Sequence, residues 1–158
     1  MTFASLLALG SCEESNLPKP LVIDNALTEA EKEAGKFTPE VMWQMGRIGA
    51  YHLSADAQKA VYGVTYYSVE QNKSRSVIYA STPNSDAVPA LLTSNGSEYA
   101  PSFIPGSDKV AFLASANDGS GTMQLWMMNA DGTGRQQISS EANGVDDYLF
   151  SPCGKKVV

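Results

Sequence analysis

The sequence predicts an all-β fold, an incomplete β-propeller of two four-stranded antiparallel blades and the start of a third, preceded by short helices. Three turns of similar composition carry Lys59, Lys109 and Lys156, which lie 50 and 47 residues apart. Each turn leads into an apolar strand, and after each of the first two turns three further short strands precede the next turn. Four short strands in a period of about 40–50 residues is the pattern of a propeller blade.

The composition is typical of a folded globular chain. Hydrophobic residues make up 43% of the 158 residues and charged residues 18%. The net charge of −6 disfavours a phosphate backbone as a ligand, so we expect no nucleic-acid partner. Two cysteines and one histidine supply neither a disulfide framework nor a zinc cluster. We therefore expect no metal and no cofactor.

Residues 1–12 resemble a bacterial lipoprotein signal peptide. The apolar run Phe3–Leu9 precedes Gly10-Ser11-Cys12, and the resemblance implies that Cys12 receives the lipid. The run is far shorter than the roughly 20 residues of a membrane-spanning helix. Because the first lysine is Lys19, the usual positive segment before the apolar run is missing. An apolar N-terminal strand with an incidental cysteine remains the alternative.

Residues 13–27 are predicted to be a linker, because Glu13–Pro20 is polar and contains two prolines. A first short helix is expected after them. Thr28 and Glu31 have the spacing of a capping box, and Gly35 is a plausible end of the helix.

A second short helix completes the predicted helical segment, residues 28–48. Thr38 is its expected N-cap, Pro39 suits the first helical position and Gly46 is expected to end it. We expect its apolar side chains to share one face; they are Val41, Met42 and Met45, with Trp43 near the edge. We interpret this segment as packing on a neighbouring domain or on the rim of the sheet. A lid that contacts substrate is the less favoured alternative.

Residues 49–158 are predicted to form the partial propeller, with blades at about 49–95 and 98–140 and a third starting at about 146. The expected strands are 50–53, 59–67, 76–81 and 89–93 in the first blade, 99–104, 109–115, 123–129 and 135–139 in the second, and 147–151 and 155–158 in the third. The pair Asp131-Gly132 predicts a hairpin turn. A β-sandwich is the alternative, but it does not require similar turns at a fixed period.

The polar residues do not predict a catalytic centre within the chain. A serine hydrolase needs a Ser, a His and an Asp, and no Gly-x-Ser-x-Gly elbow is present. We interpret His52 as a strand residue at a blade edge. The neighbouring acids Asp146 and Asp147, like Glu13 and Glu14, are interpreted as solvated or capping residues rather than as a glycosidase pair.

Two Asp- and Gly-rich loops, residues 117–121 and 129–134, superficially resemble calcium loops. They lack the full run of oxygen ligands, and we predict that they are turns between strands. The aromatic residues of the strands are expected to pack between blades rather than to stack on ligands. They are Tyr62, Tyr66, Tyr67, Tyr79, Phe112 and Trp126.

Several motifs resemble those of known families. Ser151-Pro152-Cys153-Gly154-Lys155 resembles the Ser-Pro-Asp-Gly-Lys turn of TolB-type propeller repeats, and residues 126–134 resemble the hairpin of the same repeats. Residues 37–48 and 62–74 resemble the N-terminal region of bacterial prolyl oligopeptidase family enzymes, in particular exported dipeptidyl or acylaminoacyl peptidases. The sequence departs from the pattern at Cys153, where the repeat has Asp, and at residues 54–57, which lack Pro and Gly.

The resemblance covers about residues 37–158 and implies the N-terminal propeller of an exported serine peptidase that cleaves short peptides. The propeller would gate a C-terminal α/β-hydrolase domain, which would hold the catalytic triad, so this chain alone is expected to be inactive. No catalytic residue is carried over. The alternative is a non-enzymatic TolB-like periplasmic lipoprotein used for protein–protein contact.

The resemblance and the lipobox imply a periplasmic or outer-membrane-anchored protein of a Gram-negative bacterium, tethered through Cys12. Its implied partners are peptide substrates bound with the hydrolase domain. At 47–50 residues per blade, the chain is too short to close a ring of roughly four to eight blades. We expect Val157 and Val158 to lie in a strand without its partners, and the isolated chain to be marginally stable or to aggregate. Substrate preference, blade number and oligomeric state are not predicted.

Overall fold

The computed structural model describes residues 26–158. The predicted signal peptide, Cys12 and nearly all of the predicted linker lie outside the described residues. In chain order the elements are α1 (Glu29–Ala34), α2 (Pro39–Gln44), β1 (Arg47–Leu53), β2 (Ala60–Ser68), β3 (Lys73–Ser81), β4 (Ala90–Leu91), β5 (Tyr99–Phe103), β6 (Lys109–Ser115), β7 (Met123–Asn129) and β8 (Gln136–Gln137).

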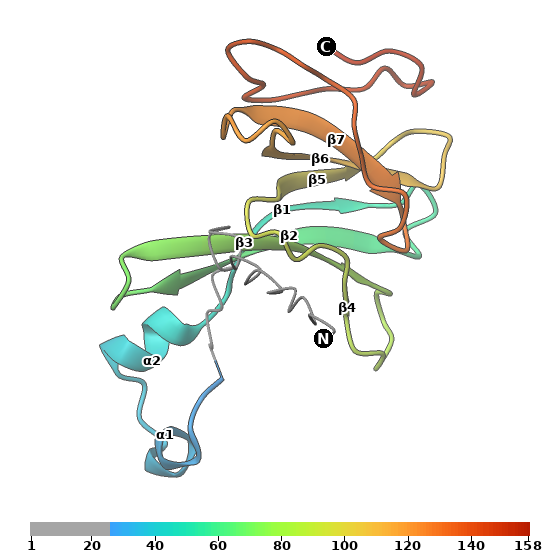
Figure 1. Ribbon diagram of the computed structural model, residues 1–158. Helices are drawn as coiled ribbons and strands as arrows, with labels where there is room; N and C mark the ends of the chain where they lie inside the picture. Colours follow the sequence, from blue (N-terminus) through green and yellow to red (C-terminus); the bar gives the residue numbers. More distant parts are fainter. Residues whose placement is uncertain (1–25) are drawn as a thin grey trace, which may run out of the picture.

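The strands form two separate four-stranded antiparallel sheets, in the orders β1-β2-β3-β4 and β5-β6-β7-β8. We call them the first and the second blade. Each strand pairs with the next strand along the chain, which is the meander of a propeller blade. The blades stack face to face (Figure 1). The predicted fold class, mostly β with two antiparallel blades after short helices, is confirmed.

Two strands of the first blade are longer than the sequence predicts, the outermost strand of each blade is shorter, and β6 and β7 have the predicted bounds. β1 and β3 each extend three residues further toward the N-terminus, whereas β4 and β8 keep only two residues each. The third predicted pair of strands, 147–151 and 155–158, is reduced to one bridge between Phe150 and Val157. A hairpin of this kind has no neighbouring sheet to extend its ladder, so only its turn and its first pairs form.

The three repeated turns have the same backbone hydrogen bonds, which confirms the internal repeat. The N–H groups of Ser54, Ile104 and Ser151 donate to the carbonyl five residues on, at 2.8, 2.9 and 2.9 Å. The same three residues accept from the N–H three residues on, at 2.8, 3.2 and 2.8 Å. In the first turn, Ala57 adopts a left-handed conformation with φ of 56°, at the place where the third turn has Gly154.

The main hydrophobic core lies between the two blades. It joins Val61 and Ile78 of the first blade to residues of the second blade that are fully or almost fully buried, namely Val110, Phe112, Ala114, Trp126 and Met128. Successive strand residues point to opposite faces, so alternate residues of β6 fill this core. Burying a side chain as large as that of Phe112 contributes about 1.5–3 kcal/mol, which makes this face the principal contact between blades.

A second core covers the other face of the second blade. Ala111, Leu113 and Leu125 pack against the segment that follows β8, which supplies Val145, Tyr148 and Phe150. This segment lies over β7 in Figure 1. The hydroxyl of Tyr148 lies 2.6 Å from the carbonyl oxygen of Ala100 and 2.9 Å from that of Ala111, so its proton is shared between them. The start of the third repeat is therefore anchored to the second blade although its strands scarcely form.

The first helix, α1, has the predicted caps. Thr28 and Glu31 form the capping box, and Gly35 ends α1 in a left-handed conformation with φ of 58°. The capping hydrogen bonds lower the pKa of Glu31, chiefly through the Thr28 hydroxyl. Within residues 26–158, no helix is long and apolar enough to cross a membrane.

The second helix, α2, differs from expectation at its end and on its face. It begins at Pro39 with Thr38 as N-cap but ends at Gln44, before Gly46. Gly46 is small for another reason: a Cβ there would lie 2.6 Å from the ring of Tyr66 and 2.7 Å from Val64. Of the expected apolar face only Val41 is buried, while Met42 and Met45 are 40% and 54% exposed. Because α2 ends at Gln44, Met45 lies outside the helix and does not share the buried face of Val41.

Candidate functional site

The first strands of the two blades, β1 and β5, lie side by side and form one continuous wall. The backbone N–H of Phe103 in β5 donates to Nδ1 of His52 in β1 at 3.2 Å. The rings of the same two residues are 6.1 Å apart. Every residue of β1 is exposed. This wall is the surface that the blades present at their first-strand edge, where a propeller has its central channel.

Two hollows open along this wall. One, of about 210 Å³, lies between the first two repeated turns and is lined by residues that include His52, Asp56, Lys59 and Asp108. The other, of about 290 Å³, lies between the first strands and the segment after β8, and its lining includes His52, Asp147 and Tyr148. His52 therefore borders both hollows, at the edge of its blade as the sequence analysis predicts.

The imidazole ring of His52 is held by a backbone contact. Nδ1 of His52 already accepts from a backbone N–H, so in the neutral ring the proton is on Nε2. In the described part of the chain no serine hydroxyl is hydrogen-bonded to this ring, although a catalytic serine requires such a base.

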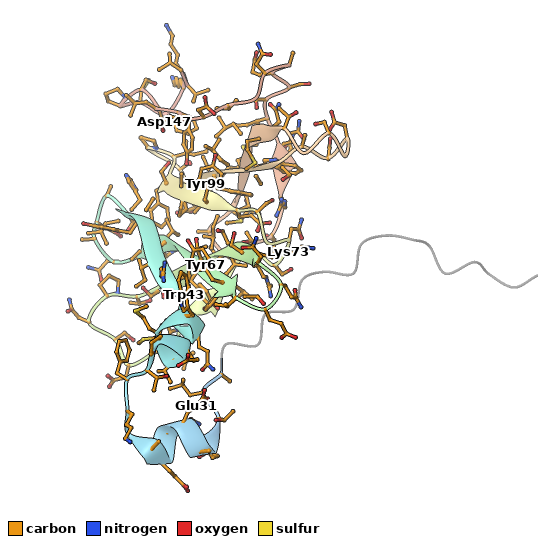
Figure 2. The ribbon with its side chains drawn as sticks, turned by 90° about the vertical axis from the view of Figure 1, so that its left-hand side faces the viewer. Glu31, Trp43, Tyr67, Lys73, Tyr99 and Asp147 are labelled. Atoms are coloured by element: carbon orange, nitrogen blue, oxygen red, sulfur yellow. The ribbon has the colours of Figure 1, made fainter. Side chains whose placement is uncertain are left out.

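The acidic pair interpreted as solvated or capping lies beside this wall. Asp147 accepts from the backbone N–H of Tyr148 at 2.8 Å, which is a local capping contact. Burial raises the pKa of Tyr99, and the nearby carboxylates of Asp146 and Asp147 raise it further. Figure 2 shows Tyr99 and Asp147 at the second-blade end of the molecule. The other acidic pair, Glu13 and Glu14, lies outside the described residues.

The two loops that superficially resemble calcium loops are turns held by their own aspartates. Asp131 accepts from the backbone N–H and the hydroxyl of Thr133 at 2.9 and 2.7 Å. Asp118 accepts from the backbone N–H of Ser120 at 2.9 Å. These hydrogen bonds lower the pKa of both carboxyl groups. The carboxylates thus stabilise the turns themselves.

Cys153 is an exposed free thiol in the third repeated turn. It lies 3.4 Å from the hydroxyl of Ser151, and this contact, with a weaker one from the backbone at Lys155, lowers the pKa of the thiol. The Asp of the consensus turn occupies this place, and Asp56 makes the same contact in the first turn, where it accepts from Ser54 at 2.6 Å. Cys153 is therefore a weaker substitute for a turn-forming carboxylate.

Most of the strand tyrosines do not pack between the described blades, contrary to expectation. Phe112 and Trp126 are in the core between blades. Tyr62 and Tyr79 instead stack on each other, with ring centroids 5.9 Å apart, and Tyr62 points away from the side of Val61, which faces the core. The hydroxyl of Tyr66 lies 3.2 Å from that of Tyr79 on the same outer face. The alternation of side chains along β2 decides which face of the blade each tyrosine occupies. The aromatic composition of the strand does not show which face that is.

A cluster around Arg47, the first residue of β1, was not predicted from the sequence. Its guanidinium carbon lies 4.4 Å from the ring centroid of Trp43 in α2 and 4.7 Å from that of Tyr67 in β2. Figure 2 shows Trp43 and Tyr67 where α2 meets the first blade, with Lys73 near them. An Arg four residues after a Trp, in an acidic chain, was the available signal. The strand partner Tyr67 was not visible from spacing.

No family model matches the chain. Among curated proteins it is 28% identical over 135 residues to dipeptidyl-peptidase 5 of Porphyromonas endodontalis, covering 85% of this chain and 19% of that protein. It is 36% identical over 121 residues to dipeptidyl-peptidase 5 of Porphyromonas gingivalis, covering 77% of this chain and 17% of that protein. The chain is homologous to these two proteins and spans less than a fifth of the length of each.

Solved structures show the same fold. Acylaminoacyl peptidase of Pyrococcus horikoshii matches with a TM-score of 0.60 at 14% identity, over 77% of this chain and 18% of that one. The β-propeller domain of the trilobed protease from Pyrococcus furiosus matches at 0.53 and 14% identity, over 71% and 32%. TolB from Acinetobacter baumannii matches at 0.52 and 25% identity, over 70% and 25%. The chain resembles the propeller portion of prolyl oligopeptidase family peptidases.

Proposed function

We propose that this chain is the propeller portion of an exported serine peptidase of the prolyl oligopeptidase family, which cleaves short peptides. The propeller would gate access to an α/β-hydrolase domain that holds the catalytic triad. The observation that carries the proposal is the homology to two dipeptidyl-peptidases 5, which extends over most of the chain. The stacking of the blades with β1 and β5 adjacent is the arrangement that lines a channel, and it supports the gating role.

A chimaera tests this proposal. The region of Porphyromonas gingivalis dipeptidyl-peptidase 5 that aligns with this chain is replaced by the matching 121 residues. We expect the chimaera to release dipeptides from chromogenic substrates and to spare folded proteins, whereas the 158-residue chain alone shows no turnover. A chimaera that folds but has lost dipeptide release contradicts the family assignment. Turnover by the chain alone that a serine-directed inhibitor abolishes contradicts the placement of the triad.

The gating role has its own readout in the same chimaera. Phe112→Ala loosens the contact between blades, and we expect it to raise the ratio of long-peptide to dipeptide turnover several-fold. Glu29→Ala, on the exposed helix α1, is the control and leaves the ratio unchanged. An equal ratio in both variants would argue that access is not controlled by the blades.

A TolB-like binding propeller is the second candidate, because the match to TolB has the highest identity of the three structures described above. The complete reading frame separates the two candidates. A Gly-x-Ser-x-Gly elbow followed by Asp and His supports the peptidase. A closed propeller without such an elbow supports the binding module.

We also propose that Cys12 is the lipid attachment site of an exported lipoprotein of a Gram-negative bacterium. The support is the lipobox-like Leu9-Gly10-Ser11-Cys12. Expression with labelled palmitate in a bacterial host tests it. We expect label in the wild-type protein and none in Cys12→Ala, with Cys153→Ala as the labelled control. Equal label in the Cys12 variant would rule out this attachment site.

A further inference from the structure

Two arginines of this protein are stacked on aromatic rings, and one of them shows what such a residue binds. The guanidinium of Arg135 lies 4.5 Å from the ring centroid of Trp126 and 5.2 Å from that of Phe112. Its free edge is filled by the carboxylate of Glu98, at 2.5 Å. Aromatic rings cover the faces of a guanidinium and leave its N–H groups at the edge, where a carboxylate fits.

The guanidinium of Arg47 is likewise stacked on two aromatic rings, but no carboxylate of the described residues pairs with its N–H edge. Trp43 and Tyr67 lie 4.4 and 4.7 Å from its guanidinium carbon. Among residues 26–158, the ion pairs are Lys32 with Glu29 and Arg135 with Glu98, so no described carboxylate lies within 4.0 Å of Arg47. The two rings are held edge to face at 5.8 Å, which fixes the direction in which the guanidinium points.

The open edge of Arg47 borders a hollow of about 420 Å³ without acidic residues. Besides Trp43, Arg47 and Tyr67, its lining consists of Ser68, Val69, Asn72, Lys73 and Ser74. Lys73 adds a second positive charge, and Figure 2 places it on the side of Tyr67. Because the lining contains two cations and no carboxylate, the hollow favours an anionic group.

We infer that this hollow is a binding site for the carboxylate of a peptide. Arg47 would hold the carboxylate through two parallel N–H···O bonds, and Lys73 would add a point charge. The volume exceeds that of a single carboxylate, so the apolar walls formed by Trp43 and Val69 have room for the attached side chain. The inference goes beyond the peptidase proposal and does not depend on it, because it concerns binding by this chain without turnover.

Two sources could supply the carboxylate that this hollow binds, and their chemistry is the same. It belongs either to a separate peptide or to an acidic residue of this chain outside the described residues, of which Glu13, Glu14 and Asp24 are the candidates. We take a separate peptide as the probe. The triple variant Glu13→Gln, Glu14→Gln, Asp24→Asn then distinguishes the two sources.

The experiment is an NMR titration of the full chain with acetyl-Ala-Glu-Ala-amide, followed through the indole N–H signals. The chain has two tryptophans, and Trp126 serves as the internal control because it is 8% exposed, against 37% for Trp43. We expect a saturable shift of the Trp43 signal and no shift of the Trp126 signal. Acetyl-Ala-Gln-Ala-amide, which has the same shape without charge, should bind at least five-fold more weakly.

Variants identify the residues responsible. Arg47→Gln should abolish the shift, and Arg47→Lys should weaken binding because Lys lacks the planar fork. Lys73→Gln, at the exposed start of β3, should weaken binding two- to five-fold and keeps the test valid if Arg47→Gln does not fold. Arg75→Gln is the matched control, because this arginine reaches the carbonyl of Ser94 outside the hollow.

If the chain supplies its own carboxylate, the triple variant shifts the Trp43 signal before any peptide is added and then binds the Glu peptide more tightly, which also supports the site. Three outcomes overturn the inference. The first is equal binding of the Glu and Gln peptides. The second is unchanged binding in both Arg47→Gln and Lys73→Gln. The third is no Trp43 shift with the Glu peptide in either the wild-type chain or the triple variant.

Discussion

At the scale of single residues, the carboxylate of Glu98 is the group that most needs hydrogen-bond and charge partners. It is fully buried, and one oxygen accepts from the backbone N–H groups of Gly96 and Ser97 at 2.8 and 3.2 Å. The other oxygen pairs with Arg135, which itself stacks on the core aromatic residues. A buried charge is tolerated only when it is paired and hydrogen-bonded, and every available partner here is used.

Glu98→Ala is therefore expected to destabilise the protein strongly. It leaves two partly buried backbone N–H groups and the Arg135 guanidinium without their acceptor, at a cost of about 3–5 kcal/mol. Glu98→Gln should cost less, because its amide oxygen still accepts from the backbone. Urea denaturation of the wild-type chain and the variants measures the difference.

The other ion pair of the described residues is the control for Glu98. Glu29 and Lys32 lie on one side of α1, with side chains 83% and 53% exposed. Water screens such a pair, so Glu29→Ala should leave the urea midpoint almost unchanged. If the urea midpoints of Glu98→Ala and Glu29→Ala are equally close to that of the wild type, burial does not increase the contribution of the Glu98 pair to the free energy of unfolding.

At the scale of elements, the repeated turns are the units that carry the architecture. Each closes the hairpin between the first two strands of its repeat by the same two backbone hydrogen bonds, although their sequences differ. The third turn has a glycine at the left-handed position, with φ of 67° at Gly154, whereas the first has Ala57 with φ of 56°. A side chain with a Cβ pays for this conformation, so the first turn is locally strained.

Ala57→Gly should stabilise the protein by about 0.5–1 kcal/mol, because glycine adopts the left-handed region without a steric penalty. Ala55→Gly, in the same turn at a position without a positive φ, is the matched control. It should destabilise by a similar amount, because glycine only adds freedom to the unfolded chain there. Thermal denaturation of the two variants should give shifts of opposite sign. Shifts of the same sign would mean that the strain is relieved elsewhere.

At the scale of the whole molecule, the stability depends on how faces are covered. The second blade is covered on both faces, by the first blade and by the segment with Val145, Tyr148 and Phe150. The first blade is covered on one face and presents the stacked Tyr62 and Tyr79 on the other. The equivalent face of the second blade carries Phe112 and Trp126 and is buried. Opposite faces of successive blades therefore meet, and the pair Tyr62 and Tyr79 of the first blade matches the pair Phe112 and Trp126 of the second.

Tyr148 links the second blade to the segment that covers it, and its titration should be visible in the stability of the molecule. Burial raises the pKa of Tyr148 to about 12, above the ordinary value of 10.0. Because the pKa is higher in the folded state, the contribution is fully present below pH 10 and is lost as the pH rises toward 12. A shift of this size corresponds to about 2–3 kcal/mol.

Tyr148→Phe provides the comparison. At pH 8 it should be less stable than wild type, because the hydroxyl contacts with Ser102, Ala100 and Ala111 are gone. Between pH 9 and pH 12 the difference from wild type should narrow by about 2–3 kcal/mol, since only the wild-type residue ionises. Urea titrations across this range measure the gap. A gap that stays constant would show that the pKa of Tyr148 is the same in the folded and unfolded states, so that burial does not raise it.

The local features of this fold were predictable from the sequence. The caps at Thr28 and Thr38, the turns at the three lysines and most strand positions depend on residues within a few places of each other, and short-range hydrogen bonds and steric limits set them. The end of α2 was not predictable from Gly46. This glycine is needed for close packing against Tyr66 and Val64 of β2, which lie some 20 residues further along the chain, and it does not end the helix.

The sequence by itself determined the class of fold, because the spacing of the repeated turns and strands can be measured directly in the sequence and matches a propeller blade. Only the tertiary structure decided which faces are buried and which charges meet. Glu98 and Arg135 are 37 residues apart, and Arg47 meets Tyr67 only because β1 pairs with β2. The outer position of Tyr62 and Tyr79 likewise depends on which side of the first blade the second blade occupies. These contacts arise when separate sheets and strands pack together, and no local pattern in the chain encodes the partner.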